Sequence, residues 1–327
     1  MTVIAILGAL HSSKPLYNAQ TVLELLAHVG ADKVQLAHVS AQDWQSGAWR
    51  DLDDPVLFAL EDARLTVAGI APDWAWAERE HTQMLEFLNQ FPQGKKRLSE
   101  VTTLEAELKT MLEQPLDAAT VHGALLEVVS SYHQRRTELL EEGPGTAHRL
   151  ERIKTIVAAL EPDAVLLAPL DDLPALLELG CTLPDLKGFT PAEPSRFRAI
   201  VDRAYRLEDG DDLDALVHQL LALDAPADTV LARIALEARF AASGLYLAVG
   251  DWQSASDLLE AVAMGQFERP SYLPGFVLTR LGQVRDLLLE RERAVRAYTA
   301  ALALAYCPNE AKEVAQQGLT VPFSLTE

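Results

Sequence analysis

The first third of the chain alternates short apolar runs with amphipathic segments. Residues 2–8 (TVIAILG) form a continuous apolar run that ends in a glycine, and residues 34–39 (VQLAHV) form a second run. Runs of this kind are typical of strands that are buried on both faces of a sheet. Between them, residues 18–29 place apolar side chains at helical spacing. The pattern predicts a β-α-β opening, with a parallel sheet and a right-handed crossover.

The part that follows is predicted to be mostly helical. Residues 55–68 begin with a proline, which suits the first turn of a helix, and residues 70–73 read at most as the end of a strand. Acidic and basic residues alternate over residues 74–140, so helices there have one solvated face. A second strand-to-helix unit then follows, with an amphipathic helix at 148–160, an apolar strand at 164–168 and a helix at 172–179.

Prolines and glycines at residues 183–194 separate this part from a purely helical remainder. Such clusters mark loops between packed elements. We therefore expect two domains. The first is an α/β domain with a mostly parallel sheet over residues 1–190, and the second is an all-α domain of helical hairpins over residues 191–327.

Three alanines recur after polar turns in the helical part. Ala215, Ala255 and Ala294 are 40 and 39 residues apart. This recurrence indicates three similar hairpins, with links slightly longer than in a repeat of about 34 residues. We expect each alanine to lie at a close helix–helix contact. Residues 309–317 are predicted to form a terminal helix that caps the last hairpin.

The last hairpin resembles a tetratricopeptide repeat. The residues that carry the resemblance are Leu281, Gly282, Ala294, Tyr298, Ala301 and Pro308. It is weaker over residues 239–267, and weaker again over residues 196–225, where Asp202-Arg203 stands in place of the close-packing glycine. The resemblance implies a scaffold that binds a protein or peptide partner. The alternative is that the hairpins merely pack against the first domain.

The N-terminal part, over roughly residues 2–180, resembles the TraB/Tiki and erythromycin-esterase-like superfamily. Gly8-Ala9-Leu10-His11 matches the motif that closes the family's first strand, and Asp32 matches the aspartate before the next one. Residues 59–72 resemble the family's helix and its following strand, and Arg149 and Arg152 match its arginine-containing helix. The resemblance implies a hydrolase-like α/β domain.

Two of the superfamily's anchors are altered. Gln35, Ala37 and His38 surround the place of its strand-end glutamate, and Asp171-Asp172 stands in place of its second histidine. A carboxylate at Glu61, Asp62 or Glu78 would restore the enzyme interpretation if it replaced that glutamate in space. These changes predict a degenerate relative of the hydrolases.

Candidate catalytic residues remain in this domain. They are His11, Asp171, Asp172, Arg149 and Arg152. A histidine at the carboxyl end of a parallel strand should face the crevice in which α/β folds bind ligands. A carboxylate opposite it could orient the histidine as a base or share a divalent metal ion. One histidine and one aspartate are too few for a firm metal site, so the sequence leaves a bound metal open and names no cofactor.

The composition limits the classes of partner. The 327 residues carry a formal net charge of −20, which disfavours nucleic acid and anionic membranes. No apolar run reaches the roughly 18 residues that a membrane helix needs, and the first residues lack the features of a signal peptide. With only Cys181 and Cys307, a structural disulfide is not expected. These features favour a soluble, cytoplasmic protein.

The sequence therefore favours a protein-interaction or scaffold protein with a degenerate hydrolase-like domain. One alternative is a hydrolase, with or without the assistance of a metal ion, that uses His11 with Asp171 or Asp172. Another is a small-molecule sensor, with the crevice as its ligand pocket and the hairpins as its output.

Overall fold

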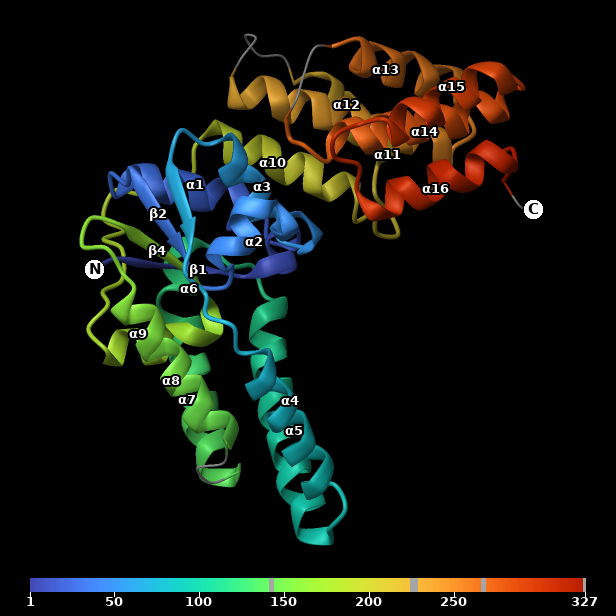
Figure 1. Ribbon diagram of the computed structural model, residues 1–327. Coiled ribbons are helices and arrows are strands. Elements are labelled where there is room, and N and C mark those ends of the chain that lie inside the picture. The colour runs from blue at the N-terminus through green and yellow to red at the C-terminus, as the bar shows by residue number, and fades with distance from the viewer. Residues whose placement is uncertain (141–143, 224–228, 266–268, 326–327) are drawn as a thin grey trace. The chain divides into compact units, whose positions relative to one another are not determined.

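The chain forms two compact units in the computed structural model, which describes residues 1–140, 144–223, 229–265 and 269–325 (Figure 1). The α/β unit comprises Met1–Trp49 and Ala63–Thr190, and the helical unit comprises Arg50–Asp62 and Pro191–Glu327. The segment Arg50–Asp62 belongs to the helical unit although it interrupts the sequence of the α/β unit. The hydrophobic pattern gives no sign of this grouping, because periodicity reports only local structure.

Among the described residues, the α/β unit contains a sheet of four parallel strands in the order β1-β4-β2-β3. Their bounds are Val3–Ile6 for β1, Lys33–Leu36 for β2, Thr66–Gly69 for β3 and Val165–Pro169 for β4. Strands β1, β2 and β4 coincide with the three apolar runs of the sequence, and their side chains are almost all buried. The predicted parallel sheet is confirmed.

Strand β3 corrects the sequence interpretation. A single helix was expected over residues 55–68, but helix α3 ends at Asp62 and β3 begins at Thr66. The strand stands at the edge of the sheet beside β2 and is only partly buried. Gly69 is required at its end, because a Cβ there would collide with the backbone oxygen of Ser40.

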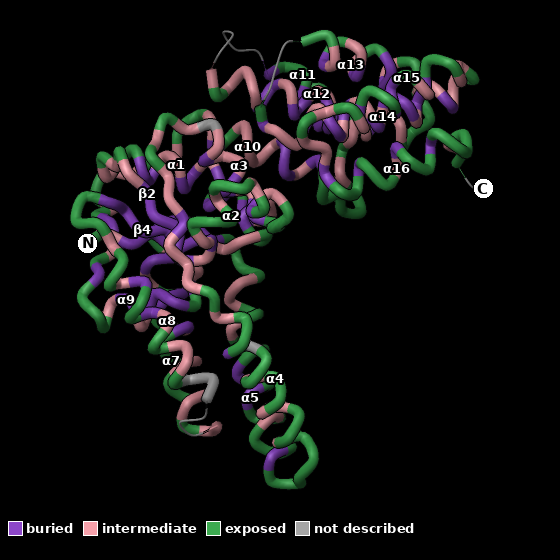
Figure 2. Tube along the Cα trace, viewed as in Figure 1, coloured by how far each residue is buried: buried purple, intermediate pink, exposed green. Residues whose placement is uncertain are grey.

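The remaining elements of the α/β unit are helical. They are α1 (Ala19–His28), α2 (Ala41–Ser46), α4 (Ala75–Leu88), α5 (Pro92–Glu113), α6 (Ala118–Val121), α7 (Ala124–Leu140), α8 (Pro144–Ala158) and α9 (Leu173–Glu178), with short 3-10 helices η1 (Gly8–Ser13) and η3 (Leu170–Asp172). A third 3-10 helix, η2 (Ala48–Asp51), lies where the chain passes to the helical unit. Figure 1 shows α4, α5, α7 and α8 extending away from the sheet. Burial is concentrated around the sheet, while α4 and α5 are largely exposed (Figure 2).

Every described element of the helical unit is a helix. These are α3 (Pro55–Asp62), α10 (Glu193–Ala204), α11 (Leu213–Leu221), α12 (Val230–Ala248), α13 (Trp252–Met264), α14 (Leu273–Leu287), α15 (Arg291–Leu302) and α16 (Asn309–Thr320). Helices α11, α13 and α15 each pack against the helix before and the helix after them. The predicted helical C-terminal region is confirmed, and the likeness to tetratricopeptide repeats stays a prediction.

Small residues allow the last helices to approach closely. Tyr298 of α15 is fully buried, and its ring lies against Gly282 of α14 and Gly318 of α16. A Cβ at Gly318 would come within 2.5 Å of that ring. Ala255 and Ala294 are fully buried as expected, but Ala215 is exposed. The register expected for the first hairpin was therefore wrong.

Candidate functional site

His11 lies just after β1, but its ring serves the local backbone. The side chain is fully buried within η1. Its Nε2 accepts a hydrogen bond from the Leu7 amide at 2.9 Å, and its Nδ1 donates to the Tyr17 carbonyl at 2.8 Å. An amide can only donate and a carbonyl can only accept, so the ring is neutral with its proton on Nδ1. Both nitrogens hold the turn after β1 together.

The outer edge of β1 is closed by two other rings. The Tyr17 hydroxyl donates to the Ala5 carbonyl at 2.8 Å, and the Ala5 amide donates to His122 Nε2 at 3.1 Å. His122 Nδ1 in turn donates to the Ala118 carbonyl at 2.8 Å. Burial lowers the pKa of His122 and outweighs the opposite effect of that last hydrogen bond. These side chains satisfy backbone groups that would otherwise be buried without partners at a sheet edge.

Charged side chains gather instead beyond the end of β4. Asp172, in η3, accepts a hydrogen bond from Arg152 of α8 through Oδ1, which also lies 3.7 Å from Arg149 Nε. The Asp172 side chain is only 3% exposed. Within the described part of the chain, its Oδ2 has no hydrogen-bond partner. Two arginines on one face of α8 therefore hold this carboxylate in place.

His133 of α7 joins the same group. Its Nδ1 accepts from Arg149 Nη1 at 2.7 Å, and its Nε2 donates to Asp171 Oδ1 at 2.8 Å. Burial would raise the pKa of Asp171, but the His133 hydrogen bond and the charges of Arg149 and Arg136 lower it below its ordinary value. We call these five residues, His133, Arg149, Arg152, Asp171 and Asp172, the β4-end cluster.

A second histidine borders the β4-end cluster. Arg136 of α7 donates to His81 Nε2 of α4 at 2.8 Å. Burial, together with the Arg136 charge, lowers the pKa of His81. Its neutral form is therefore favoured, which suits its role as an acceptor for an arginine.

The β4-end cluster could move a proton only after a rearrangement. Both nitrogens of His133 are occupied, one by an arginine and one by a carboxylate. Arg149 would have to leave before His133 could accept a proton from a substrate. Over the residues that the structure describes, no three His, Cys, Asp or Glu side chains come together as metal ligands.

The structure brings together four of the five candidate residues. Arg149, Arg152, Asp171 and Asp172 meet beyond β4, whereas the contacts given above for His11 go to the Leu7 amide and the Tyr17 carbonyl. His133 was not among the residues predicted from the sequence. One signal could have revealed it, since His133 and Arg136 are three residues apart on a helix, as are Arg149 and Arg152. Each pair therefore lies on one helix face.

One of the three residues around the predicted place of the superfamily's glutamate, Gln35, is a structural side chain. Gln35 is buried on β2, and its Oε1 accepts from the Glu161 amide at 2.9 Å. Its Nε2 donates to the Ala159 carbonyl at 3.3 Å. Of the three possible replacements, Glu61 forms an ion pair with Arg50 at 2.6 Å, within the segment grouped with the helical unit. The side chains of Asp62 and Glu78 lie outside the described residues.

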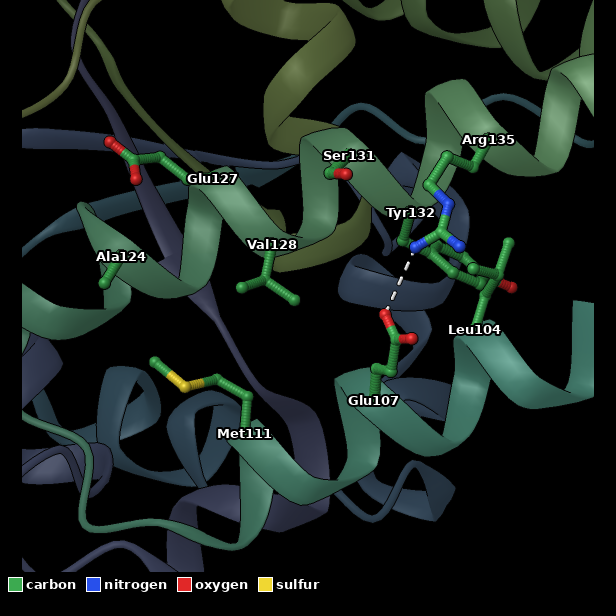
Figure 3. Close-up of a pocket in the computed structure, with 9 residues that line it drawn as sticks. All are labelled: Leu104, Glu107, Met111, Ala124, Glu127, Val128, Ser131, Tyr132 and Arg135. Atoms are coloured by element: carbon green, nitrogen blue, oxygen red, sulfur yellow. Dashed lines mark hydrogen bonds and ion pairs between the residues drawn. The ribbon is translucent and has the colours of Figure 1, made fainter.

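A cavity of about 400 Å³ lies between α5 and α7 (Figure 3). It is lined by Leu104, Glu107, Met111, Ala124, Glu127, Val128, Ser131, Tyr132 and Arg135. Arg135 donates to Glu107 at 3.2 Å, and the close-up shows this ion pair spanning the two helices. Arg135 and Glu107 neutralise each other, and Glu127 adds a further acidic side chain to the lining, so the cavity by itself does not identify a ligand.

The helical unit holds a more deeply buried charged group, which we call the α10–α12 network. Arg198 donates to Asp202 through Nε at 2.8 Å and to Glu237 through Nη1 at 2.6 Å. The Tyr272 hydroxyl also donates to Glu237. The exposed fractions of the Arg198, Asp202 and Glu237 side chains are 17%, 11% and 9%. Burial and the nearby Glu237 carboxylate raise the pKa of Asp202, although Arg198 acts in the opposite direction.

The segment Arg50–Asp62 contacts the helical unit at several points. The Phe58 and Tyr272 rings meet edge to face with centroids 4.9 Å apart, and the Glu61 carbonyl accepts from Arg269. At the other end, the Arg50 guanidinium lies over the Tyr306 ring, 5.3 Å from its centroid. The helical unit therefore holds a stretch of chain that is distant from it in sequence.

No protein-family model matches the sequence, and comparisons with curated proteins and with solved structures give no match. The two resemblances drawn from sequence motifs accordingly stay predictions. None of the described helices is both long enough and apolar enough to cross a bilayer.

Proposed function

We propose that the protein is an interaction scaffold whose helical unit binds polypeptide segments. The observation that carries this proposal is the segment Arg50–Asp62, a helix with flanking residues that the helical unit already holds. The contacts combine an aromatic pair, a cation over an aromatic ring and hydrogen bonds to backbone carbonyls. Stacked helices commonly present extended surfaces that use such contacts to hold peptides.

The contacts are specific enough to select a segment. The Tyr306 hydroxyl donates to the Arg50 carbonyl and the Asn309 amide to Asp51, both at 3.3 Å. The Phe58–Tyr272 pair adds an aromatic contact that is worth about 0.5–1.5 kcal/mol beyond its buried area. On the segment, Arg50 and Asp51 lie in η2 and Phe58 lies in α3. Their partners are Tyr272 just before α14, Tyr306 just before α16 and Asn309 at its start.

The contacts of the α/β unit support the part of the proposal that makes this unit a degenerate relative of the hydrolases. A hydrolase that used His11 with Asp171 or Asp172 would need them to meet, and His11 instead serves the turn after β1. Gln35 is likewise occupied by backbone groups at the place of the superfamily's glutamate.

The test uses the full chain and a fluorescent peptide that spans residues 50–62. In the parent, the tethered segment outcompetes the peptide, because tethering gives an effective concentration of about 1 mM or more. A double variant, Arg50→Ala with Phe58→Ala, should release the segment and bind the peptide saturably in fluorescence anisotropy. A control with Arg296→Ala and Phe87→Ala changes exposed residues and should behave like the parent.

The proposal fails if the double variant keeps its helical circular dichroism but shows no saturable binding. It also fails if the control variant binds the peptide as strongly as the double variant does.

A further inference from the structure

Arg280 of α14 is a half-buried cation held against an aromatic ring. Its guanidinium lies over Phe240 of α12, 4.3 Å from the ring centroid. Gly244, one turn further along α12, makes room for it, since a Cβ there would come within 3.0 Å of Arg280 Nη1. The side chain is therefore positioned by its neighbours and is not a loose surface arginine.

Arg280 has no carboxylate partner among the described residues. The two acids of the α10–α12 network, Asp202 and Glu237, are both bound to Arg198. Burial lowers the pKa of Arg280, with only Tyr205 acting in the opposite direction. A guanidinium nevertheless keeps its charge in proteins. In a chain of net charge −20, this side chain thus carries a positive charge that no carboxylate of the described residues pairs with.

Arg280 lies on the same side of α14 as Tyr272, the residue that Phe58 contacts. Tyr272 just precedes α14, while Phe276 and Arg280 follow at intervals of four residues, so the three lie along one stripe. The Phe276 ring is 6.4 Å from both Tyr272 and Phe240. Phe58 sits on Tyr272 at one end of this stripe. At a rise of 1.5 Å per residue, the eight residues from Tyr272 to Arg280 correspond to about 12 Å.

We infer that, once the segment Arg50–Asp62 leaves Tyr272, this stripe receives a partner helix that has an aromatic residue at the Tyr272 end and an acidic side chain at Arg280. The inference rests on the proposed function and adds the chemistry of the partner. A carboxylate matches the guanidinium fork with two parallel hydrogen bonds. On a partner helix lying along α14, about 12 Å separates residues seven or eight positions apart. A polyanion such as nucleic acid fits poorly, because the chain as a whole repels it.

The probes are two alanine-based helical peptides of equal length. One carries Phe and Glu eight residues apart, and the other carries Phe and Gln at the same positions. The protein is the full chain with Arg50→Ala and Phe58→Ala, which frees Tyr272. We expect the Glu peptide to bind about tenfold more tightly than the Gln peptide, because a charge-assisted hydrogen bond contributes free energy of the size that changes affinity about tenfold.

Variants of this background assign the preference to Arg280. Arg280→Gln should bind the two peptides equally, and Arg280→Lys should keep part of the preference because it keeps the charge. Arg296→Gln, at an exposed arginine of α15, should keep all of it. Circular dichroism of each variant shows whether the helices are intact.

Equal affinities of the two peptides for the chain that carries Arg280 would overturn the inference. So would a preference that survives in Arg280→Gln. If the peptide of residues 50–62 binds while neither designed peptide does, the proposed function stands and this inference falls.

Discussion

The β4-end cluster and the α10–α12 network use the same ingredients in different surroundings. Both pair arginine side chains of a helix with two carboxylates, two arginines in the β4-end cluster and one, Arg198, in the network. In the α10–α12 network all three ionic side chains are at least four-fifths buried, whereas in the β4-end cluster Asp171 is 59% exposed. Water therefore reaches Asp171 of the β4-end cluster but hardly reaches the network. Removing a carboxylate should cost more stability in the network than in the β4-end cluster.

The difference also bears on function. A buried ion network fixes one arrangement of helices, since breaking any pair leaves an uncompensated charge. In the helical unit this fixes the surface that holds Phe58, because Tyr272 donates to the buried Glu237. The β4-end cluster leaves a carboxylate oxygen of Asp172 without a partner among the described residues, so it is less completely satisfied.

The largest expected effect comes from Glu237→Ala. The variant leaves Arg198 with one of its two carboxylates and removes the acceptor of the Tyr272 hydroxyl. We expect a loss of about 3–5 kcal/mol in the free energy of unfolding of the helical unit. Urea unfolding followed by circular dichroism measures it. Glu292→Ala, at an exposed residue of α15, should change stability by less than about 0.5 kcal/mol. A similar loss of stability in Glu237→Ala and Glu292→Ala would show that burial of the carboxylate does not set its contribution.

Asp172→Ala should have an intermediate effect. Its carboxylate is nearly buried but its partner Arg152 is 24% exposed, so the freed arginine can reach water. We expect a loss of about 1–3 kcal/mol, the usual range for a hydrogen bond to a charged group. Urea unfolding of the full chain tests this value. A loss as large as that of Glu237→Ala would show that exposure does not set the difference.

Changing pH should act on the two units in opposite directions. The pKa of His122 is lowered by burial, so its contribution is complete above the ordinary value of about 6.5 and is lost as the pH falls through the folded-state pKa. The pKa of Asp202 is raised, so ionising it costs stability, and that cost is relieved as the pH falls through its folded-state pKa. Hydrogen exchange at pH 7 and pH 5 should show weaker protection near β1 and no such loss near α10. Replacing His122 with Gln should reduce the pH dependence near β1, and an unchanged dependence would contradict this assignment.

The smallest effect is expected for Asp171→Asn, the exposed counterpart of Asp172. It removes one charge but lets the side-chain oxygen keep accepting from His133. Exposed ion pairs contribute about 0–1 kcal/mol, so we expect a change within that range. Parallel urea titrations of Asp171→Asn and Asp172→Ala make the comparison direct. A larger loss for Asp171→Asn would reverse the order that burial predicts.

Candidate residues near one another in sequence were easier to place than distant ones. Asp171 and Asp172 follow β4, and α8 directly precedes it, so a short chain brings Arg149 and Arg152 to them. His11 follows a different strand, and η1 turns its ring toward the backbone, a local choice of hydrogen bonds that the Gly-x-x-His motif does not reveal. The prediction for Ala215 was wrong for a related reason. Helix α11 buries Leu216 and Leu220 and leaves the alanine exposed.

The sequence by itself determined the central strands, the amphipathic helices and the helical character of the C-terminal region. When a helix or strand is buried on one or both faces, its apolar residues recur at the spacing of that element, and this spacing can be recognised in the sequence. Only the tertiary structure decided that β3 is an edge strand, that His133 joins the β4-end cluster and that Arg50–Asp62 belongs to the helical unit. Those outcomes depend on contacts between segments far apart in sequence, such as Phe58 with Tyr272, and such contacts leave no periodic signal in the chain.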